Sequence, residues 1–352
     1  MKKEQRVVYV QGIDSIAAVL YSEYYERDWL VVPMLRQIYN KYLRNFLDGE
    51  GNLCFKYSSL MVKRLLRYYD PELVEHFREI EFTANLYPLV NWIMTLFAHS
   101  VPLIKGQLTQ IWTSIFSQQS LEYFFYLAVA IFIHSKPTLL PLDLNDTLQL
   151  ISHLGSIIDV PQVLEMADRL QTKTPQSFVQ NDLIGPSQHK LDLSQILKDS
   201  AYFQDRWWEL DQLDYNESFD ICLLSAEDYL KRKSMLTIDI RPWSEFHACH
   251  IRGSYHMREM HVEFIRCYRE NYGDNVIVVV GDRETPGHTF IQELLALESS
   301  ISKICMLRGG IDAIKMEGMQ VLRKGQKNAR AEDFTQQYDK FVKKAVQLKA
   351  KK

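Results

Sequence analysis

The feature that most constrains this chain of 352 residues is a change of hydrophobic period near Phe219. Before it, over residues 7–178, apolar side chains recur at helical spacing and strand signals are weak. After it, short β-branched runs at 234–240 and 275–280 alternate with helical stretches. That alternation is typical of a parallel sheet with helices on both faces. The pattern predicts a multidomain protein, with an all-α half followed by an α/β half that contains a parallel sheet.

The same pattern sets the expected domain boundaries. The period fades between residues 180 and 216, where proline, glycine and acidic residues mix with tryptophans. Near the end of the chain, apolar side chains recur every three or four residues among lysines, which predicts a basic amphipathic helix. The expected parts are a helical domain at 1–178, a linker at 179–215, an α/β domain at 216–330 and a basic helix at 331–352.

Composition excludes several classes of protein. The net charge of −3 gives no general attraction to nucleic acid, so we expect no nucleic-acid partner. The five cysteines are odd in number and form no C-x-x-C pair, which indicates reduced thiols in a cytoplasmic protein. The apolar run at 123–133 is about half of the roughly 20 residues that cross a bilayer, so we expect a buried helix there.

One stretch of the helical half, residues 58–80, has a clear amphipathic pattern. Its apolar stripe consists of Leu60, Met61, Leu65 and Tyr68. Lys63, Arg64 and Arg67 are expected on the opposite face. Asp70 before Pro71 predicts a break, after which Asp70 caps a second helix.

In the α/β half, the stretch LTIDIRPWSEFHACHIRGSYHM at 236–257 resembles the first signature of the rhodanese family, D-x-R-x-x-x-E-F-x-x-G-H-I-x-G. The matching residues are Asp239, Arg241, Glu245, Phe246, His250, Ile251 and Gly253. Cys249 replaces a usual glycine. Gly309 and Gly310, in LRGGIDAI, match the closing signature. The resemblance covers residues 219–323 and implies a rhodanese-like domain.

Rhodanese chemistry needs a thiolate at a strand end, within backbone N–H groups that lower its pKa. The resemblance places that position at Val280 or Gly281, and neither residue has a nucleophile. Asp282 and Glu284 would also repel an anion held there. The expected vacant loop consists of Val280, Gly281, Asp282, Arg283, Glu284 and Thr285. We therefore expect no sulfurtransferase or phosphatase activity, and an inactive domain that binds a protein segment in this loop.

Possible metal ligands gather between residues 247 and 261. They are His247, Cys249, His250, His256 and His261. They show no paired metal-ligand spacing, and the rhodanese resemblance makes His250 a structural residue. We expect neither a metal nor a cofactor.

A second resemblance covers residues 7–178. The stretch WIMTLF at 92–97 and the pair Ile111–Trp112 resemble motifs of TBC domains, the fold of Rab GTPase-activating proteins. Thr113 replaces the aspartate that usually follows the tryptophan. Upstream, YVQGIDSI at 9–16 resembles the TBC motif Y-x-Q-G-[ML]-x-D. The resemblance implies a helical lobe that binds a small GTPase.

Two interpretations of Gln11 stay open. In the first, Gly12 loosens the start of a helix, Asp14 and Ser15 cap it, and Gln11 faces solvent. In the second, which the TBC resemblance implies, Gln11 is a glutamine finger that orients the water attacking the γ-phosphate of a bound nucleotide. Tyr9 and Gly12 would then shape its turn. Phosphoryl transfer depends on such positioning and on electrostatic stabilisation.

The TBC resemblance also implies an arginine from an upstream I-x-x-D-x-x-R motif, worth on the order of 10³–10⁵ in rate. The ten residues before Gln11 contain no such motif. We therefore expect either an N-terminally truncated sequence or a loss of activity.

A TBC domain followed by a rhodanese-like domain without its cysteine resembles the family of TBC-domain-containing kinase-like proteins, and also a Golgi-associated group of adaptors. The resemblance implies a Rab-family small GTPase and other subunits of a trafficking complex as partners, on endosomal or Golgi membranes. We expect a GTPase-binding or trafficking scaffold; the alternative is an active Rab GTPase-activating protein in a longer form, using Gln11 with an upstream arginine. The basic tail is either a solvated face or a peripheral membrane contact.

Overall fold

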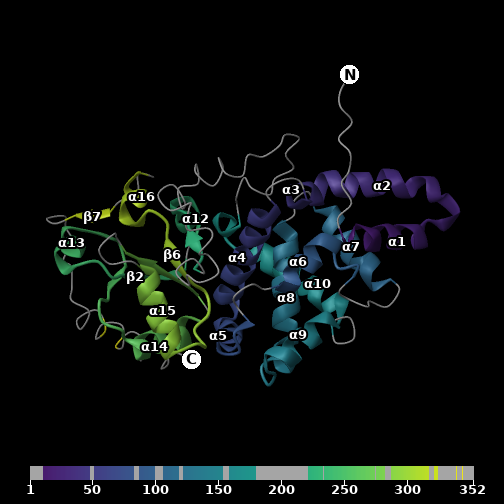
Figure 1. Cartoon of the computed structure of the whole chain (residues 1–352). Coiled ribbons are helices and arrows are strands. Elements are labelled where there is room, and N and C mark those ends of the chain that lie inside the picture. Colours follow the sequence, from purple (N-terminus) through teal and green to yellow (C-terminus); the bar gives the residue numbers. More distant parts are fainter. Residues whose placement is uncertain are drawn as a thin grey trace. The chain divides into compact units, whose positions relative to one another are not determined.

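The computed structural model describes residues 11–47, 51–82, 87–99, 106–118, 122–153, 158–179, 221–232, 234–273, 275–281, 287–316, 321–323, 338 and 343. The chain divides into two compact units (Figure 1). The first unit contains Met1–Lys63, His76–Thr174 and Asn181–Glu217, and the second contains Arg64–Glu75, Pro175–Gln180 and Ser218–Lys352. Two short stretches of the helical half therefore belong to the second unit.

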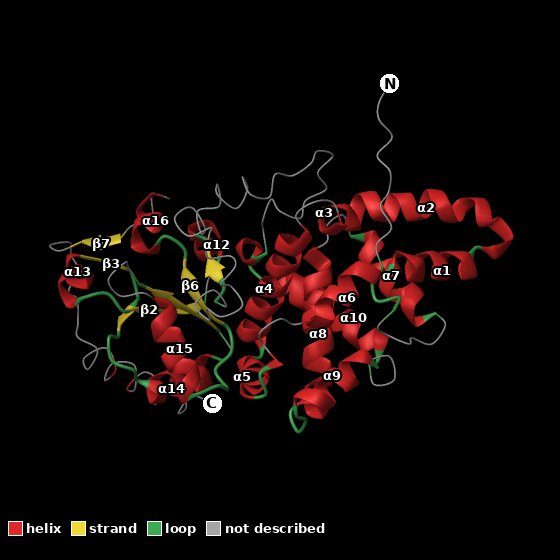
Figure 2. Ribbon diagram, viewed as in Figure 1, coloured by secondary structure: helices red, strands yellow, loops and turns green. Residues whose placement is uncertain are grey.

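The described part of the helical half consists of helices and short connections (Figure 2). The helices are α1 (Ile13–Glu23), η1 (Tyr25–Leu30), α2 (Val31–Ile38), η2 (Tyr39–Leu43), α3 (Arg44–Leu47), α4 (Gly51–Tyr69), α5 (Pro71–Glu79), α6 (Tyr87–Thr95), α7 (Gln107–Ser117), α8 (Glu122–Leu139), α9 (Leu144–Ser152), α10 (Val160–Lys173) and η5 (Gln176–Phe178). The all-α prediction for this half is confirmed.

Helix α8 is buried on all sides over residues 123–132, as its continuous apolar sequence predicts. The Tyr123 hydroxyl donates a hydrogen bond to Asp168 Oδ1 of α10 at 2.9 Å. Burial and the Asp168 carboxylate raise the pKa of Tyr123 above its usual value. Within the described ranges, no helix is long and apolar enough to cross a bilayer.

Helix α4 differs from its expected amphipathic form. The apolar stripe is buried as predicted, but Lys63 and Arg64 are only 9% and 8% exposed, and Arg67 is half-buried. The prediction that these cations form an open opposite face is wrong. The reason is that every residue from Leu60 to Leu66 is buried, so this stretch of α4 is covered on all sides. The break after α4 is confirmed, because Asp70 Oδ1 accepts a hydrogen bond from the Leu73 N–H at 3.1 Å.

The second unit contains a sheet of five parallel strands in the order β1-β6-β5-β2-β4 and an antiparallel pair, β3-β7. The strands are β1 (Leu223–Leu224), β2 (Met235–Asp239), β3 (Cys249–Ile251), β4 (Tyr255–His256), β5 (Val276–Val280), β6 (Ile304–Leu307) and β7 (Val321–Arg323). The helices between them are α12 (Ala226–Lys231), α13 (Trp243–Ala248), α14 (Val262–Tyr272), α15 (Gly287–Leu297) and α16 (Gly310–Met316). The predicted parallel sheet is confirmed.

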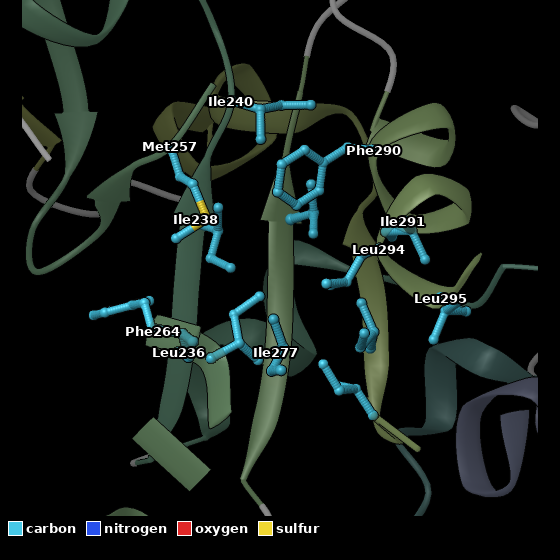
Figure 3. Close-up of a cluster of buried hydrophobic side chains, with 14 of the residues drawn as sticks. Leu236, Ile238, Ile240, Met257, Phe264, Ile277, Phe290, Ile291, Leu294 and Leu295 are labelled. Carbon is cyan, nitrogen blue, oxygen red and sulfur yellow. The ribbon is translucent and has the colours of Figure 1, made fainter. Parts of the chain in front are cut away.

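Helices cover both faces of this sheet, which explains why its central strand β5 is continuously apolar. On one face, α14 and α15 pack on alternate strand residues such as Leu236, Ile238 and Ile277 (Figure 3). On the other face, the Tyr229 hydroxyl of α12 lies 2.8 Å from Thr237 Oγ1 of β2. Strand β5, in the middle, is buried along its whole length.

Residues from the helical half complete the second unit. The Ser177 N–H donates to Asp228 Oδ2 at 2.7 Å, and the Ser177 hydroxyl accepts from the Ser225 N–H at 3.1 Å. Ser225 Oγ also caps α12 by accepting from the Asp228 N–H at 3.1 Å. Immediately before β6, the Lys303 N–H donates to the carbonyl of Tyr68. The carboxylate of Asp228 thus accepts a hydrogen bond from the Ser177 N–H, and not from the Ser225 N–H as it would in a capping box.

The predicted linker at 179–215 lies outside the described residues apart from Val179. Of the predicted basic helix at 331–352, only Tyr338 and Lys343 are described. The Tyr338 ring lies 6.0 Å from the Phe264 ring and packs against the hydrophobic core of the sheet. Lys343 is exposed.

Candidate functional site

The chain turns at Gln11 and Gly12, immediately before helix α1. Gln11 is exposed and Gly12 is buried. Gly12 has a φ of 104°, in the region that favours glycine, and its N–H donates to Asp14 Oδ1 at 3.0 Å. Gly12 itself occupies the N-cap, so the capping roles expected of Asp14 and Ser15 are not observed. The turn is closed instead by the Ser15 N–H, which donates to the Gly12 carbonyl at 3.1 Å.

This turn lies against the end of helix α6. A Cβ atom on Gly12 would lie 2.9 Å from Thr95 Cγ2, so the contact leaves room for glycine only. The Thr95 hydroxyl donates to the Asn91 carbonyl at 2.8 Å, and it accepts from the His99 N–H at 3.3 Å. Ser15 Oγ lies 3.4 Å from His99 Nδ1. Two motifs far apart in sequence therefore meet at one place, beneath Gln11.

The end of α6 is itself rigidly built. Leu96 and Phe97 have φ values of 47° and 69°, which cost roughly 1–2 kcal/mol each for residues with a side chain. The Trp112 indole N–H donates to the Leu96 carbonyl at 2.7 Å, and the Phe97 ring stacks on Phe124 at 5.1 Å. These buried contacts offset the cost of the left-handed backbone. They explain why Trp112, Leu96 and Phe97 appear together in the motif.

The geometry gives Gln11 an exposed amide on a fixed turn, where it can donate and accept hydrogen bonds to a partner. Thr95 was predicted as part of a motif, and the structure shows that its methyl group supports Gly12. The contacts of Asn91 and His99 with this site were not predicted. Asn91 contributes its backbone carbonyl and His99 a ring contact, and neither kind of contact can be recognised in a single sequence. Tyr9 lies outside the described residues.

A second candidate site lies at the carboxyl ends of the parallel strands, where β2 ends in a buried ion pair. Arg241 donates to Asp239 through Nε at 3.0 Å and through a terminal nitrogen at 2.7 Å, and it also donates to the Cys249 carbonyl at 2.8 Å. Burial lowers the pKa of Arg241, but the hydrogen bonds and charge of Asp239 outweigh it, so its pKa is raised. Glu245 is a distant partner at 3.5 Å. The pair fixes the loop after β2 rather than facing a ligand.

Two histidines of this region, His250 and His256, have structural roles. The His250 ring stacks on Phe246 at 4.3 Å, and Nδ1 lies 2.9 Å from the Phe246 carbonyl. Burial lowers the pKa of His250 below its ordinary value. His256 Nε2 lies 2.8 Å from the Arg241 carbonyl. Across the described part of the chain, no three His, Cys, Asp or Glu residues gather as a metal site.

The predicted vacant loop begins where β5 ends. Val280 is buried and its carbonyl accepts from the Ile240 N–H at 3.0 Å, while Gly281 is half-buried. A Cβ on Gly310 would lie 2.8 Å from the Gly281 carbonyl oxygen, so this glycine lets the turn before α16 reach the end of β5. Gly309 and Gly253 also have left-handed backbones, with φ values of 70° and 82°. The other predicted loop residues (Asp282, Arg283, Glu284 and Thr285) lie outside the described residues.

The described cysteines lie away from the end of β5. Cys222 is buried immediately before β1 and Cys305 is buried within β6, and Cys249 and Cys267 are half-buried in β3 and α14. Burial raises the pKa of Cys222 to about 12 and that of Cys305 well above its usual value. Thiols in this state are poor nucleophiles. The side chain of Cys54, in α4, is outside the described set.

Comparison with known proteins agrees with this architecture. Residues 1–140 match the Rab-GTPase-TBC domain family, and residues 225–317 match the rhodanese-like domain family. The protein therefore carries a TBC Rab-GAP domain followed by a rhodanese-like domain.

Three relatives show how far the similarity extends. The chain is 24% identical over 351 aligned residues to the TBC domain-containing protein kinase-like proteins of Homo sapiens and Gallus gallus, covering 89% of this chain and 38% of each relative. It is 29% identical over 147 residues to the Rab GTPase-activating protein tbc-11 of Caenorhabditis elegans, covering 42% of this chain and 15% of that protein. The chain thus spans well under half the length of these curated relatives.

Proposed function

We propose that this protein is a trafficking scaffold that binds a Rab-family GTPase through its TBC domain and a further protein through its rhodanese-like domain. The observation that carries the proposal is the exposed Gln11, held on a turn by the contact between Gly12 and Thr95. At this position an amide can bind a water or an oxygen near a GTPase-bound nucleotide. A single neutral hydrogen bond accelerates GTP hydrolysis little, so we favour GTPase binding over catalysis as the role of this site.

The rhodanese-like domain fits recognition for a different reason. By the rhodanese resemblance, Val280 or Gly281 takes the place of the nucleophile, and the described thiols are buried or lie on other elements. Sulfur transfer and cysteine-based phosphate transfer both need a thiolate at this strand end. The remaining backbone scaffold is suited to holding an extended protein segment.

The alternative function is GTPase activation with Gln11 as the glutamine finger. It requires an arginine at the nucleotide. Such an arginine stabilises the charge of the transition state and accelerates GTP hydrolysis by a factor on the order of 10³–10⁵. The retained geometry of Gln11 favours this alternative wherever such an arginine is supplied.

A single assay on the full chain distinguishes the two functions. Purified Rab GTPases, loaded with GDP, with GTP, or with GDP and aluminium fluoride, are titrated and single-turnover GTP hydrolysis is followed in parallel. The scaffold predicts binding that prefers the GTP state, a loss of about three- to tenfold in affinity for Gln11→Ala, and less than about tenfold acceleration of hydrolysis. Gln37→Ala, at another exposed glutamine of the first unit, is the matched control.

Two results would decide against the scaffold. Acceleration of about 10³ or more that disappears in Gln11→Ala would establish the alternative. Failure of every GTP-loaded Rab to bind would overturn both. Placement on endosomal or Golgi membranes belongs to the same proposal, and deletion of residues 331–352 should then lower flotation with phosphatidylserine liposomes.

A further inference from the structure

The large apolar side chains exposed on the first unit concentrate in one stretch. Five of the six described ones lie there: Tyr21 (57% exposed), Tyr24 (37%), Tyr25 (65%), Trp29 (66%) and Val32 (65%); the sixth, Leu148 (40%), lies in α9. Every residue from 21 to 29 is exposed. The stretch lies where α1 and α2 join through η1, at the right of Figure 1. We call residues 21–32 the aromatic surface; exposed apolar groups gathered in this way mark interaction sites.

The charges of the aromatic surface indicate what it binds. Glu23, Glu26 and Asp28 are acidic and exposed, and Arg27 is the single basic residue between 21 and 32. The Tyr25 hydroxyl donates to Glu26 Oε1 at 2.9 Å. Tyrosine and tryptophan faces attract arginine and lysine by cation–π interactions, and nearby carboxylates add to that attraction. The aromatic surface therefore suits a cationic partner that also has apolar groups to bury.

A shallow, open cavity of about 540 Å³ adjoins this surface at Glu23. Glu23, at the end of α1, is the only charged residue among the described ones that line it. Polar side chains of α7 supply the rest of its hydrogen-bonding groups, namely Thr109, Gln110, Thr113 and Ser114. Thr113 is the residue that replaces the aspartate of the TBC motif, so the single carboxylate here comes from α1. A guanidinium group that entered would meet Glu23 and several neutral acceptors.

We propose that the aromatic surface and its cavity bind a protein partner through a segment in which arginine alternates with apolar residues. One arginine enters the cavity and pairs with Glu23, and the apolar side chains cover Trp29 and Tyr25. Three carboxylates disfavour an anionic membrane surface, and they would repel a second copy of the same surface. The site lies at the opposite end of the 11-residue helix α1 from Gln11.

Synthetic peptides test the chemistry directly on the full chain. The probe is a fluorescent octapeptide of alternating leucine and arginine, and its controls replace each arginine with glutamate or each leucine with glycine. We expect the leucine–arginine peptide to bind at least tenfold more tightly than either control. Glu23→Gln and Trp29→Ala should each weaken it about fivefold or more. Leu297→Ala, at a leucine of the second unit that is 65% exposed, should leave binding unchanged.

The remaining outcomes would overturn the proposal. Equal binding of all three peptides, or an equal loss in Leu297→Ala, would show non-specific attraction. Flotation of the wild type with phosphatidylcholine or phosphatidylserine vesicles, lost in Trp29→Ala, would assign the surface to a membrane. A dimer in sedimentation velocity, lost in Trp29→Ala, would assign it to a second copy. Since all the substituted residues are exposed, circular dichroism should show unchanged folding.

Discussion

Replacement of Gly12 by alanine tests the contact on which the Gln11 site depends. The new Cβ would lie 2.9 Å from Thr95 Cγ2, and the backbone would keep a φ of 104°. A strained backbone of this kind costs roughly 1–3 kcal/mol, and an overpacked contact adds about 1–3 kcal/mol. We therefore expect Gly12→Ala to lower the free energy of unfolding around α1 by about 2–6 kcal/mol. Hydrogen exchange of peptides covering α1 and α6 measures this locally.

Two further variants separate the backbone cost from the contact. Gly106→Ala has nearly the same φ, 99°, at the start of α7, but no heavy atom lies within 4 Å of its new Cβ. It should show the backbone cost alone, and the excess in Gly12→Ala should be about 1–3 kcal/mol. Thr95→Ser removes the methyl group and keeps the hydroxyl, so the double variant should recover that excess. Equal losses at the two glycines, without recovery by Thr95→Ser, would refute the contact as the support of Gln11.

The second unit offers three further tests. Asp239→Ala leaves the Arg241 charge buried and should lower the free energy of unfolding by about 3–5 kcal/mol in urea. Glu227→Ala, in an exposed pair with Lys231, should cost much less, and similar losses would contradict the buried pair. Because burial lowers the pKa of His250, the unfolded chain binds a proton at this residue before the folded chain does as the pH falls. The stability that His250 contributes should therefore be complete above about pH 6.5 and decrease as the pH drops below it. His250→Gln should reduce this decrease, and an unchanged slope of stability against pH would exclude His250 as its source. N-Ethylmaleimide should label Cys249 and Cys267 long before Cys222 and Cys305, and equal rates by mass spectrometry would contradict the burial of the latter pair.

Sequence patterns predicted the fold correctly where the burial of an element follows from its own residues. The continuous runs in β5 and α8 specify burial on all sides, and the structure agrees. They failed where burial depends on distant segments. Lys63 and Arg64 have the spacing of an open face, but the parts of α4 belong to two units and those side chains are covered.

The candidate site shows the same division. One interpretation of the sequence placed Gln11 in solvent at the start of a helix, and in the structure Gln11 is exposed while Gly12 beside it is buried. Its support by Thr95 and His99 could not be predicted, because those contacts join residues brought together only by folding. The aromatic surface was missed for another reason: Tyr21, Tyr25 and Trp29 have helical spacing typical of a core, and only the structure shows that nothing described covers them.

The membership of residues 64–75 in the second unit has a consequence for synthesis on the ribosome. The Cys222 thiol donates to the Arg64 carbonyl across 158 positions of chain, and Tyr68 meets Lys303 across a still longer loop. Domains ordinarily fold from the amino terminus as they emerge, but this helical stretch leaves the exit tunnel long before its strands exist. During translation the side of α4 that packs on the second unit therefore stays uncovered, and Tyr68 is exposed to other contacts. The contacts between α4 and the strands form late, because contacts over long sequence separations form slowly.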